Sequence, residues 1–214
     1  MLITANMMSD ILTSQQQLGA LVADVAGMRG IEMATVESAC SSGASAARWG
    51  FMAVAGGMHD SVAVCGMESM TSASREDTTA ALATAADWEL EGCVGETFVS
   101  LKAKIMALYM GTYGVVSNDF AHFSINAHDN GFTNPNAFLQ KKIDRDTYLN
   151  SRMLADPVKL FDAPPVCDGA AAVILANESV AGEASRSGLP LLGSTSCTSL
   201  VSSCRPSGHS SRPL

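Results

Sequence analysis

A strand-to-helix junction over residues 33–55 constrains the fold more than any other feature of this chain. Residues 33–37 form a short strand-like run, and residues 40–55 have the composition and spacing of a helix. Residues 61–66 (Ser-Val-Ala-Val-Cys-Gly) then form a continuously apolar strand. Strand, helix and strand predict a βαβ unit, in which parallel strands are joined by a right-handed crossover. The predicted fold class is therefore α/β.

The helix of this unit is rich in small residues. Residues 40–55 include Gly43 and Gly50 and five alanines. An interior glycine costs a helix up to about 1 kcal/mol, but small side chains let neighbouring backbone approach closely. We therefore expect a helix that is buried on several sides.

Cys40 stands at the start of this helix, in the segment Val-Glu-Ser-Ala-Cys-Ser-Ser-Gly-Ala-Ser-Ala (residues 36–46). The unpaired N–H groups and positive dipole of a helix start favour a thiolate over a thiol, so Cys40 is the candidate nucleophile. This effect is limited, and a second activating group, most often a histidine, is expected. The competing interpretation is that Cys40 is a small buried hydrophobic residue.

Composition narrows the class of protein. The 214 residues are 47% hydrophobic, enough for a substantial core, and the net charge of −8 disfavours nucleic acid as a partner. No CxxC motif occurs, the first residues lack a basic signal-peptide region, and the longest purely apolar run (170–176) is too short to span a membrane. We predict reduced thiols in a cytoplasmic protein with no membrane span. The six cysteines are Cys40, Cys65, Cys93, Cys167, Cys197 and Cys204.

The composition changes near residue 184. All 21 acidic residues lie at or before Glu183, whereas residues 184–214 contain no acid and ten serines. Two interpretations stay open: a flexible tail, or a sequence that has lost its proper continuation, which we favour. The predicted domains are residues 1–183 and an irregular tail, 184–214.

Other segments follow clear patterns. Helices are predicted over residues 17–28, over 98–112, from a cap at residues 117–119 to Gly131, and from a cap at Asp144 to Met153. Residues 170–176 predict a further buried strand. Residues 68–160 are therefore expected to be a mostly helical insertion, and three strands are too few to complete a doubly wound sheet.

Five segments, in order, resemble the thiolase superfamily, in its sterol-carrier-protein-x and archaeal acetyl-CoA acetyltransferase-like branch. The resemblance covers residues 15–181, nearly four fifths of the chain. Its segments are residues 17–24 (Gln-Leu-Gly-Ala-Leu-Val-Ala-Asp), 36–46, 64–71 (Val-Cys-Gly-Met-Glu-Ser-Met-Thr), 134–137 (Asn-Pro-Asn-Ala) and 168–172 (Asp-Gly-Ala-Ala-Ala).

The resemblance implies part of the first half of a five-layer αβαβα fold, with Cys40 as the residue that an acyl-CoA acylates. It implies a thiolase-type acyltransferase with a coenzyme A thioester as substrate, no other cofactor, no metal, and a homodimer or hetero-oligomer. The family's activating histidine and second cysteine come from the other half. No Gly-His-Pro motif occurs, and Gly208-His209-Ser210 lies in the tail. A leading strand and helix before Gln15 are implied to be missing or truncated, so the chain is expected to be incomplete as a catalyst.

The remaining polar candidates receive no catalytic role. Ser41 and Ser42 are expected to satisfy the helix start. His59 is predicted to be an exposed turn residue, and His128 to make a structural hydrogen bond. Because His122 and His128 are six residues apart, they face different sides of a helix and do not form a metal site.

The substrate-binding residues stay unassigned. Met67 and Met70 are candidates for an acyl pocket, although methionines there are typical of core packing. Eight basic residues within 68–160 share that stretch with twelve acids, which favours a mixed solvated surface over a CoA site. They are Arg75, Lys102, Lys104, Lys141, Lys142, Arg145, Arg152 and Lys159.

Two further function classes stay open beside the acyltransferase. A non-catalytic thiolase-like subunit would bind acyl-CoA or a protein partner, using apolar surface that an unclosed sheet exposes. A cysteine hydrolase would use the same turn geometry.

Overall fold

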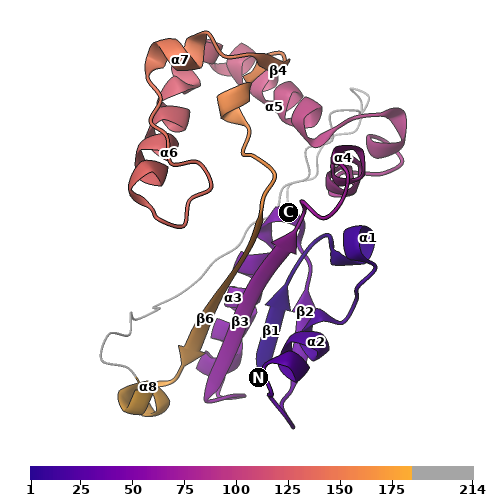
Figure 1. Cartoon of the computed structure of the whole chain (residues 1–214), viewed down its shortest axis with the longest axis vertical. Helices are drawn as coiled ribbons and strands as arrows, with labels where there is room; N and C mark the ends of the chain where they lie inside the picture. The colour runs from indigo at the N-terminus through magenta and orange to yellow at the C-terminus, as the bar shows by residue number, and fades with distance from the viewer. Residues whose placement is uncertain (185–214) are drawn as a thin grey trace. The chain divides into compact units, whose positions relative to one another are not determined.

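The computed structural model describes residues 1–184, which divide into two compact units. The first, here called the sheet unit, comprises residues 1–81 and the described residues from Asp168 onward. The second, the helical unit, comprises Leu82–Cys167. Both are drawn in Figure 1.

A four-stranded sheet organises the sheet unit. Its strands are β1 (Leu2–Ala5), β2 (Met33–Val36), β3 (Ser61–Ser69) and β6 (Asp168–Ala176), in the order β2-β1-β3-β6. Strand β1 runs parallel to β2 and β3, whereas β6 is antiparallel to β3 along all nine of its residues. The carboxyl ends of the three parallel strands therefore share one edge.

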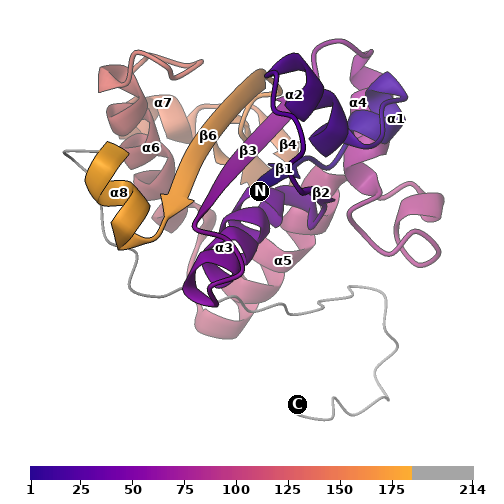
Figure 2. The same cartoon turned by 90° about the horizontal axis from the view of Figure 1, so that it is seen from below.

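Two helices cover opposite faces of this sheet (Figure 2). Helix α2 (Leu18–Val25) lies against β1 and β2, and α3 (Ser42–Ala55) lies against β1 and β3. At Gly50, an added Cβ would lie 2.9 Å from Leu175 Cδ1 and 3.0 Å from Val64 Cγ2. The small residues of α3 thus allow the close packing on the sheet that the sequence predicts. The short helices of the sheet unit are α1 (Ser9–Thr13), the 3-10 helix η1 (Ala39–Ser41) and α8 (Glu178–Ala184).

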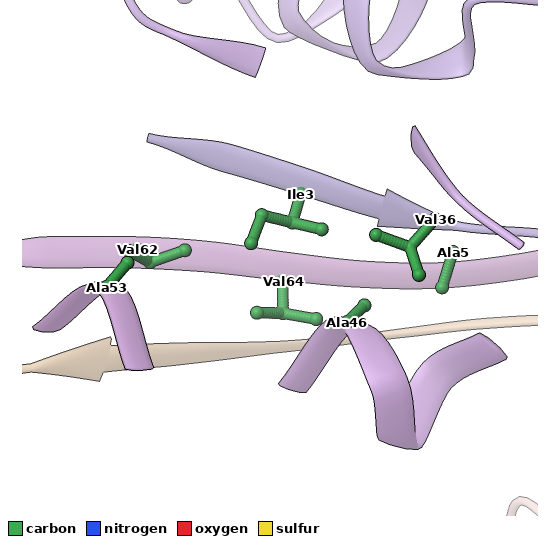
Figure 3. Packing of buried hydrophobic residues seen from close by; sticks show 7 residues of the cluster. All are labelled: Ile3, Ala5, Val36, Ala46, Ala53, Val62 and Val64. Carbon is green, nitrogen blue, oxygen red and sulfur yellow. The ribbon is translucent and has the colours of Figure 1, made fainter. Parts of the chain in front are cut away.

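The core of the sheet unit lies between α3 and the sheet. Alternate residues of each strand point toward α3, as expected for a period of two. Figure 3 shows the seven buried residues of this cluster: Ile3, Ala5, Val36, Ala46, Ala53, Val62 and Val64. On the other face, Thr4 is fully buried, and its hydroxyl lies 3.0 Å from Thr35 Oγ1.

Two expectations about burial are wrong. Helix α3 buries only one face within the described chain, since Trp49 is 54% exposed and Met52 53% exposed. Strand β6 is present where residues 170–176 predict it, but Val173 is 51% exposed and Ile174 77% exposed. The reason is position: β6 is the last strand of the described sheet, so its apolar composition does not imply burial.

Most predicted elements are confirmed, with shifts at their ends. The predicted strands correspond to β2 and β3, and β3 extends three residues beyond Gly66. Sequence reasoning did not predict β1 or α1, which occupy the stretch before Gln15 in which the resemblance implied a missing or truncated strand and helix.

The helical unit is built mainly from α5 (Phe98–Tyr113) and α6 (Ala121–Thr133), with α4 (Arg75–Ala83) crossing its boundary with the sheet unit. The predicted cap at Asp144 is confirmed, since Asp144 accepts the Thr147 N–H at 2.8 Å. The cap predicted at residues 117–119 acts elsewhere: Asp119 accepts the Val116 N–H at 2.9 Å at the start of a 3-10 helix, and α6 itself begins without a side-chain cap. The remaining elements are η2 (Gly92–Val94), η3 (Ser117–Phe120), α7 (Arg145–Leu149), β4 (Met153–Ala155), β5 (Val158–Lys159) and η4 (Leu160–Asp162).

A buried tyrosine organises the helical unit. Tyr148 has no exposed surface, and its hydroxyl donates to Asp162 Oδ1 at 2.9 Å. Burial, together with the Asp162 carboxylate, raises the pKa of Tyr148. Lys159 Nζ donates to the Leu149 carbonyl at 2.6 Å and lies 5.5 Å from the Tyr148 ring centroid. Lys159 is thus a buried structural residue, not a surface cation.

Candidate functional site

The segment that carries Cys40 is a tight turn between β2 and α3, here called the Cys40 turn (residues 37–42). Strand β2 ends at Val36, η1 covers Ala39–Ser41, and α3 begins at Ser42. Cys40 therefore lies in a 3-10 turn that immediately precedes the α-helix. The α-helix begins two residues later than predicted, at Ser42 and not at Cys40. The Cys40 side chain is exposed. The alternative that Cys40 is a buried hydrophobic residue is wrong.

The backbone of the Cys40 turn is strained at one residue. Ala39 has a φ of +46°, in the left-handed region that non-glycine residues rarely adopt. This conformation costs an alanine about 1–2 kcal/mol. The strained residue immediately precedes the cysteine, so its backbone conformation determines the direction of the chain at Cys40.

Three side chains hold this strained backbone. Ser42 Oγ accepts the Ser38 N–H at 2.9 Å and donates to the Ala39 carbonyl at 2.6 Å. Glu37 Oε1 accepts the Ala39 N–H at 2.5 Å. Ser41 Oγ donates to the Ser38 carbonyl at 2.7 Å.

The two serines therefore satisfy the turn that leads into the helix, as expected in outline. They bind backbone groups of residues 38 and 39, whereas a cap would bind the first free N–H groups of the helix. Sequence reasoning missed the roles of Glu37 and Ala39, because neither residue type signals a left-handed turn.

The thiol of Cys40 makes no hydrogen bond within residues 1–184. Among the described residues of the sheet unit, no histidine makes a hydrogen bond to this thiol. His59 Nε2 instead lies 2.9 Å from Glu32 Oε2. His59 is also half-buried, so the prediction of an exposed turn residue is wrong in its exposure. His209 lies outside the described residues.

The two histidines of the helical unit have separate structural partners. His122 Nδ1 lies 2.7 Å from the Asp119 carbonyl, and His128 Nδ1 lies 2.6 Å from the Lys141 carbonyl. The structural hydrogen bond predicted for His128 is confirmed. Within the described chain, no group of three His, Cys, Asp or Glu residues could hold a metal ion.

A cavity of about 460 Å³ opens at the carboxyl ends of β1 and β3. Met67 lines it, as the sequence allows for an acyl pocket, whereas Met70 and Cys40 are not among its lining residues. Asn6 Nδ2 donates to the Met67 carbonyl at 2.6 Å, and Glu68 Oε1 accepts the Met7 N–H at 2.6 Å. Two of its polar lining residues, Asn6 and Glu68, thus connect the chain just after β1 to β3.

The basic residues of the helical unit mostly have local partners. Lys104 pairs with Glu96, and Lys142 Nζ lies 3.6 Å from Asp129 Oδ1. Lys102 Nζ lies 5.1 Å from the Phe98 ring centroid. These contacts agree with a surface of mixed charge.

The described cysteines are all free thiols: Cys40, Cys65, Cys93 and Cys167. The other two, Cys197 and Cys204, lie outside the described residues, as does most of the predicted tail. No helix in the described part of the chain is long and apolar enough to cross a membrane.

Comparison with known proteins identifies the family of the chain. Residues 1–179 match the model of the thiolase N-terminal domain. The chain is 42% identical over 178 residues to an acetyl-CoA acetyltransferase of Methanothermobacter thermautotrophicus, covering 83% of this chain and 46% of the relative. It is 36% identical to an acetyl-CoA acetyltransferase of Methanocaldococcus jannaschii, covering 83% and 45%.

A solved structure shares the fold. The chain superposes on an Ltp2-ChsH2(DUF35) aldolase with a TM-score of 0.69 at 21% identity, covering 85% of this chain and 46% of that one. The chain thus spans less than half the length of the proteins it matches. The strand-turn-helix around Cys40, the ordered sequence segments and the match over residues 1–179 together show that this chain belongs to the thiolase family.

Proposed function

We propose that this chain takes part in acyl transfer from an acyl-CoA, with Cys40 as the nucleophile. The observation that carries the proposal is an exposed thiol on a strained strand-to-helix turn, with Ala39 held at a φ of +46°. Two relatives named acetyl-CoA acetyltransferase support the reaction class.

The proposed step is a thioester exchange. The Cys40 thiolate attacks the thioester carbonyl, a bond forms between Sγ and the acyl carbon, and the bond from that carbon to the CoA sulfur breaks. CoA leaves as a thiolate and takes up the proton that Cys40 lost. A sulfur nucleophile suits this exchange because the bonds made and broken are of the same kind, so the acyl group can also be passed on.

After acylation, the acyl group can pass to either of two acceptors. A carbanion of a second acyl-CoA would give the synthetic reaction, and CoA itself would give the degradative one. We propose that the chain alone is acylated slowly and does not turn over, because no described side chain of the sheet unit contacts the thiol as an acid or base. The four free thiols support a reducing compartment such as the cytoplasm.

Intact-mass analysis after incubation with acetyl-CoA tests the proposal. We expect one added acetyl group on the wild-type chain and none on Cys40→Ser. Cys93→Ser is the matched control, because Cys93 is also exposed. Absence of any adduct on the wild type, across acyl-CoAs of different chain length, would contradict the proposal.

A second candidate function is a non-catalytic subunit that binds acyl-CoA or a protein partner. The exposed apolar face of α3, with Trp49 and Met52 both more than half exposed, favours it. It predicts association in light scattering or CoA binding in calorimetry. A chain that is monomeric, stable and shows no heat with CoA rules it out.

A further inference from the structure

We propose that Ser42 is the positioning residue for Cys40: its hydroxyl fixes the turn that aims the thiol. This inference rests on the proposed function, in which Cys40 is the nucleophile. Ser42 is the first residue of α3 and only 5% exposed, although it is a polar residue two positions after an exposed cysteine. A buried hydroxyl at such a place requires partners.

The hydroxyl of Ser42 bridges the two residues that precede Cys40. It accepts the Ser38 N–H at 2.9 Å and donates to the Ala39 carbonyl at 2.6 Å. The backbone N–H of Ser42 also donates to the Ala39 carbonyl. One side chain therefore binds the peptide group that follows Ala39 and the N–H of the residue before it, and it does so from the first residue of a helix packed on the sheet.

The strain at Ala39 makes these bonds consequential. Alanine adopts the left-handed region only when its surroundings enforce it. Without the Ser42 hydroxyl, the Ser38 N–H loses its partner and the Ala39 carbonyl loses one of two donors. Ala39 can then relax toward the ordinary β or right-handed region, which rotates the direction of the Cys40 side chain.

The neighbouring serine provides an internal comparison. Ser41 is exposed, and its hydroxyl donates to the Ser38 carbonyl at 2.7 Å and lies 3.0 Å from Ser38 Oγ. The Ser38 carbonyl also accepts the Ser41 backbone N–H at 3.0 Å, so it keeps a donor when the Ser41 hydroxyl is removed. Ser41→Ala is therefore the comparison variant, because it removes one hydroxyl from the same turn and leaves each bonded backbone group with a partner, whereas loss of the Ser42 hydroxyl leaves the Ser38 N–H without one.

The test compares Ser42→Thr with Ser42→Val. The two side chains have the same shape, so any cost of an added methyl group in this buried position is common to both, and only the hydroxyl differs. The readout is the rate of acetyl transfer from acetyl-CoA to Cys40, measured by intact mass, beside the rate of alkylation of Cys40 by iodoacetamide.

We expect Ser42→Val to form the acetyl-enzyme about 10- to 100-fold more slowly than Ser42→Thr, because misplacement by about 1 Å can cost 100-fold in an oriented reaction. Alkylation should differ by less than about threefold, because it needs only an exposed thiol and no oriented substrate. Ser41→Ala should acetylate within about threefold of wild type, because the Ser38 carbonyl keeps the Ser41 N–H as a donor and the turn keeps its orientation.

If Ser42→Val does not fold, Ala39→Gly provides a second test. Glycine adopts the left-handed region without strain, so Ala39→Gly should make the turn less dependent on Ser42. We expect the slowing caused by Ser42→Ala to shrink when Ala39→Gly is also present. Equal acetylation rates of Ser42→Thr and Ser42→Val, or equal slowing in Ser41→Ala and Ser42→Ala, would overturn the positioning role of Ser42 but not the role of Cys40. A wild-type chain that is never acetylated would overturn the proposed function itself.

Discussion

Two exposed cysteines of this chain stand on three-residue 3-10 turns, and they differ in what surrounds them. The Cys40 turn connects a strand of the sheet to the 14-residue helix α3, and its thiol has no hydrogen bond within the described residues. The Cys93 turn (residues 92–95) lies between shorter elements of the helical unit, and Cys93 Sγ donates to the Glu89 carbonyl at 3.1 Å.

The two cysteines show that an exposed thiol is not the same as a thiol held in a fixed orientation. Both thiols are exposed, but only Cys40 has an unengaged sulfur on backbone held from both sides. The left-handed residue comes before the cysteine at one turn, as Ala39, and after it at the other, as Gly95 with a φ of +90°. Since glycine takes this conformation without strain, the left-handed residue of the Cys93 turn does not need side-chain hydrogen bonds to hold it, whereas Ala39 does.

The largest expected difference is in reactivity with acetyl-CoA. We expect the Cys93→Ser chain to be acetylated at the wild-type rate. In the Cys40→Ser chain, Cys93 should not take up a detectable acetyl group, even at high acetyl-CoA concentration. The rate at Cys93 should be at least about 100-fold below that at Cys40, because it lacks an oriented approach. Peptide mapping of the Cys40→Ser chain measures this, and comparable labelling of Cys93 would show that exposure alone is sufficient.

The next largest effect concerns the helix that supports the Cys40 turn. Gly50→Val should lower the free energy of unfolding by about 1–3 kcal/mol, because its Cβ meets Leu175 and Val64 at 2.9 and 3.0 Å. Gly111 in α5 is the matched control, since an added Cβ there meets nothing within 4 Å. Urea unfolding checks both variants. If the Gly50→Val chain is as stable as the Gly111→Val chain, α3 does not pack closely on the sheet at Gly50.

A smaller effect should distinguish the two left-handed residues. Gly95→Ala should destabilise the chain by about 1 kcal/mol, since the new side chain must adopt a strained conformation. Ala39→Gly should change the free energy of unfolding by less than about 0.5 kcal/mol, because relief of strain is offset by greater freedom of the unfolded chain. Thermal or urea unfolding of both variants tests this. A large gain from Ala39→Gly would mean that the turn is less well held than its hydrogen bonds indicate.

The smallest effect is a contrast in acid titration. Hydrogen bonds from the Thr71 hydroxyl and backbone N–H lower the pKa of Asp168, which ties the end of β3 to the start of β6. Beside the Cys93 turn, hydrogen bonds from Lys104 and Ser100 lower the pKa of Glu96. Each lowered pKa contributes stability above the ordinary value of its carboxyl group, and this stability is lost as the pH falls through the lowered value.

The donors predict different responses to salt. Added salt should raise the pKa of Glu96, because Lys104 is charged, and leave that of Asp168 nearly unchanged. Thr71→Val should raise the pKa of Asp168 toward 3.8, because it removes the hydroxyl whose hydrogen bond lowers that pKa most. Carboxyl chemical shifts followed by NMR against pH check both statements. A salt-independent Glu96 would indicate that Lys104 is not its partner in solution.

Periodicity was sufficient to predict the elements that carry Cys40. Strand β2, helix α3 and strand β3 follow from apolar runs and small residues, and the cap at Asp144 follows from its residue type. Strand β1 escaped prediction because it is four residues long and contains Thr4, whose burial depends on a partner, Thr35, 31 positions away.

Burial and backbone strain were not predictable in the same way. The apolar residues of β6 indicate a strand, but whether they are covered depends on the order of strands in the sheet, which is a tertiary property. Ala39 carries no sign of its left-handed conformation, because alanine has no preference for it. The hydroxyl of Ser42 is an ordinary feature of a helix start until its two partners are seen.

We expect the Cys40 thiol to accept an acyl group as a thioester and to be able to return it to CoA. Acetylated wild-type chain, freed of excess acetyl-CoA, should carry its label on the peptide that contains Cys40, and added CoA should remove that label with formation of acetyl-CoA. A label that resists CoA, or one spread over Cys93 and lysine residues, would contradict the account.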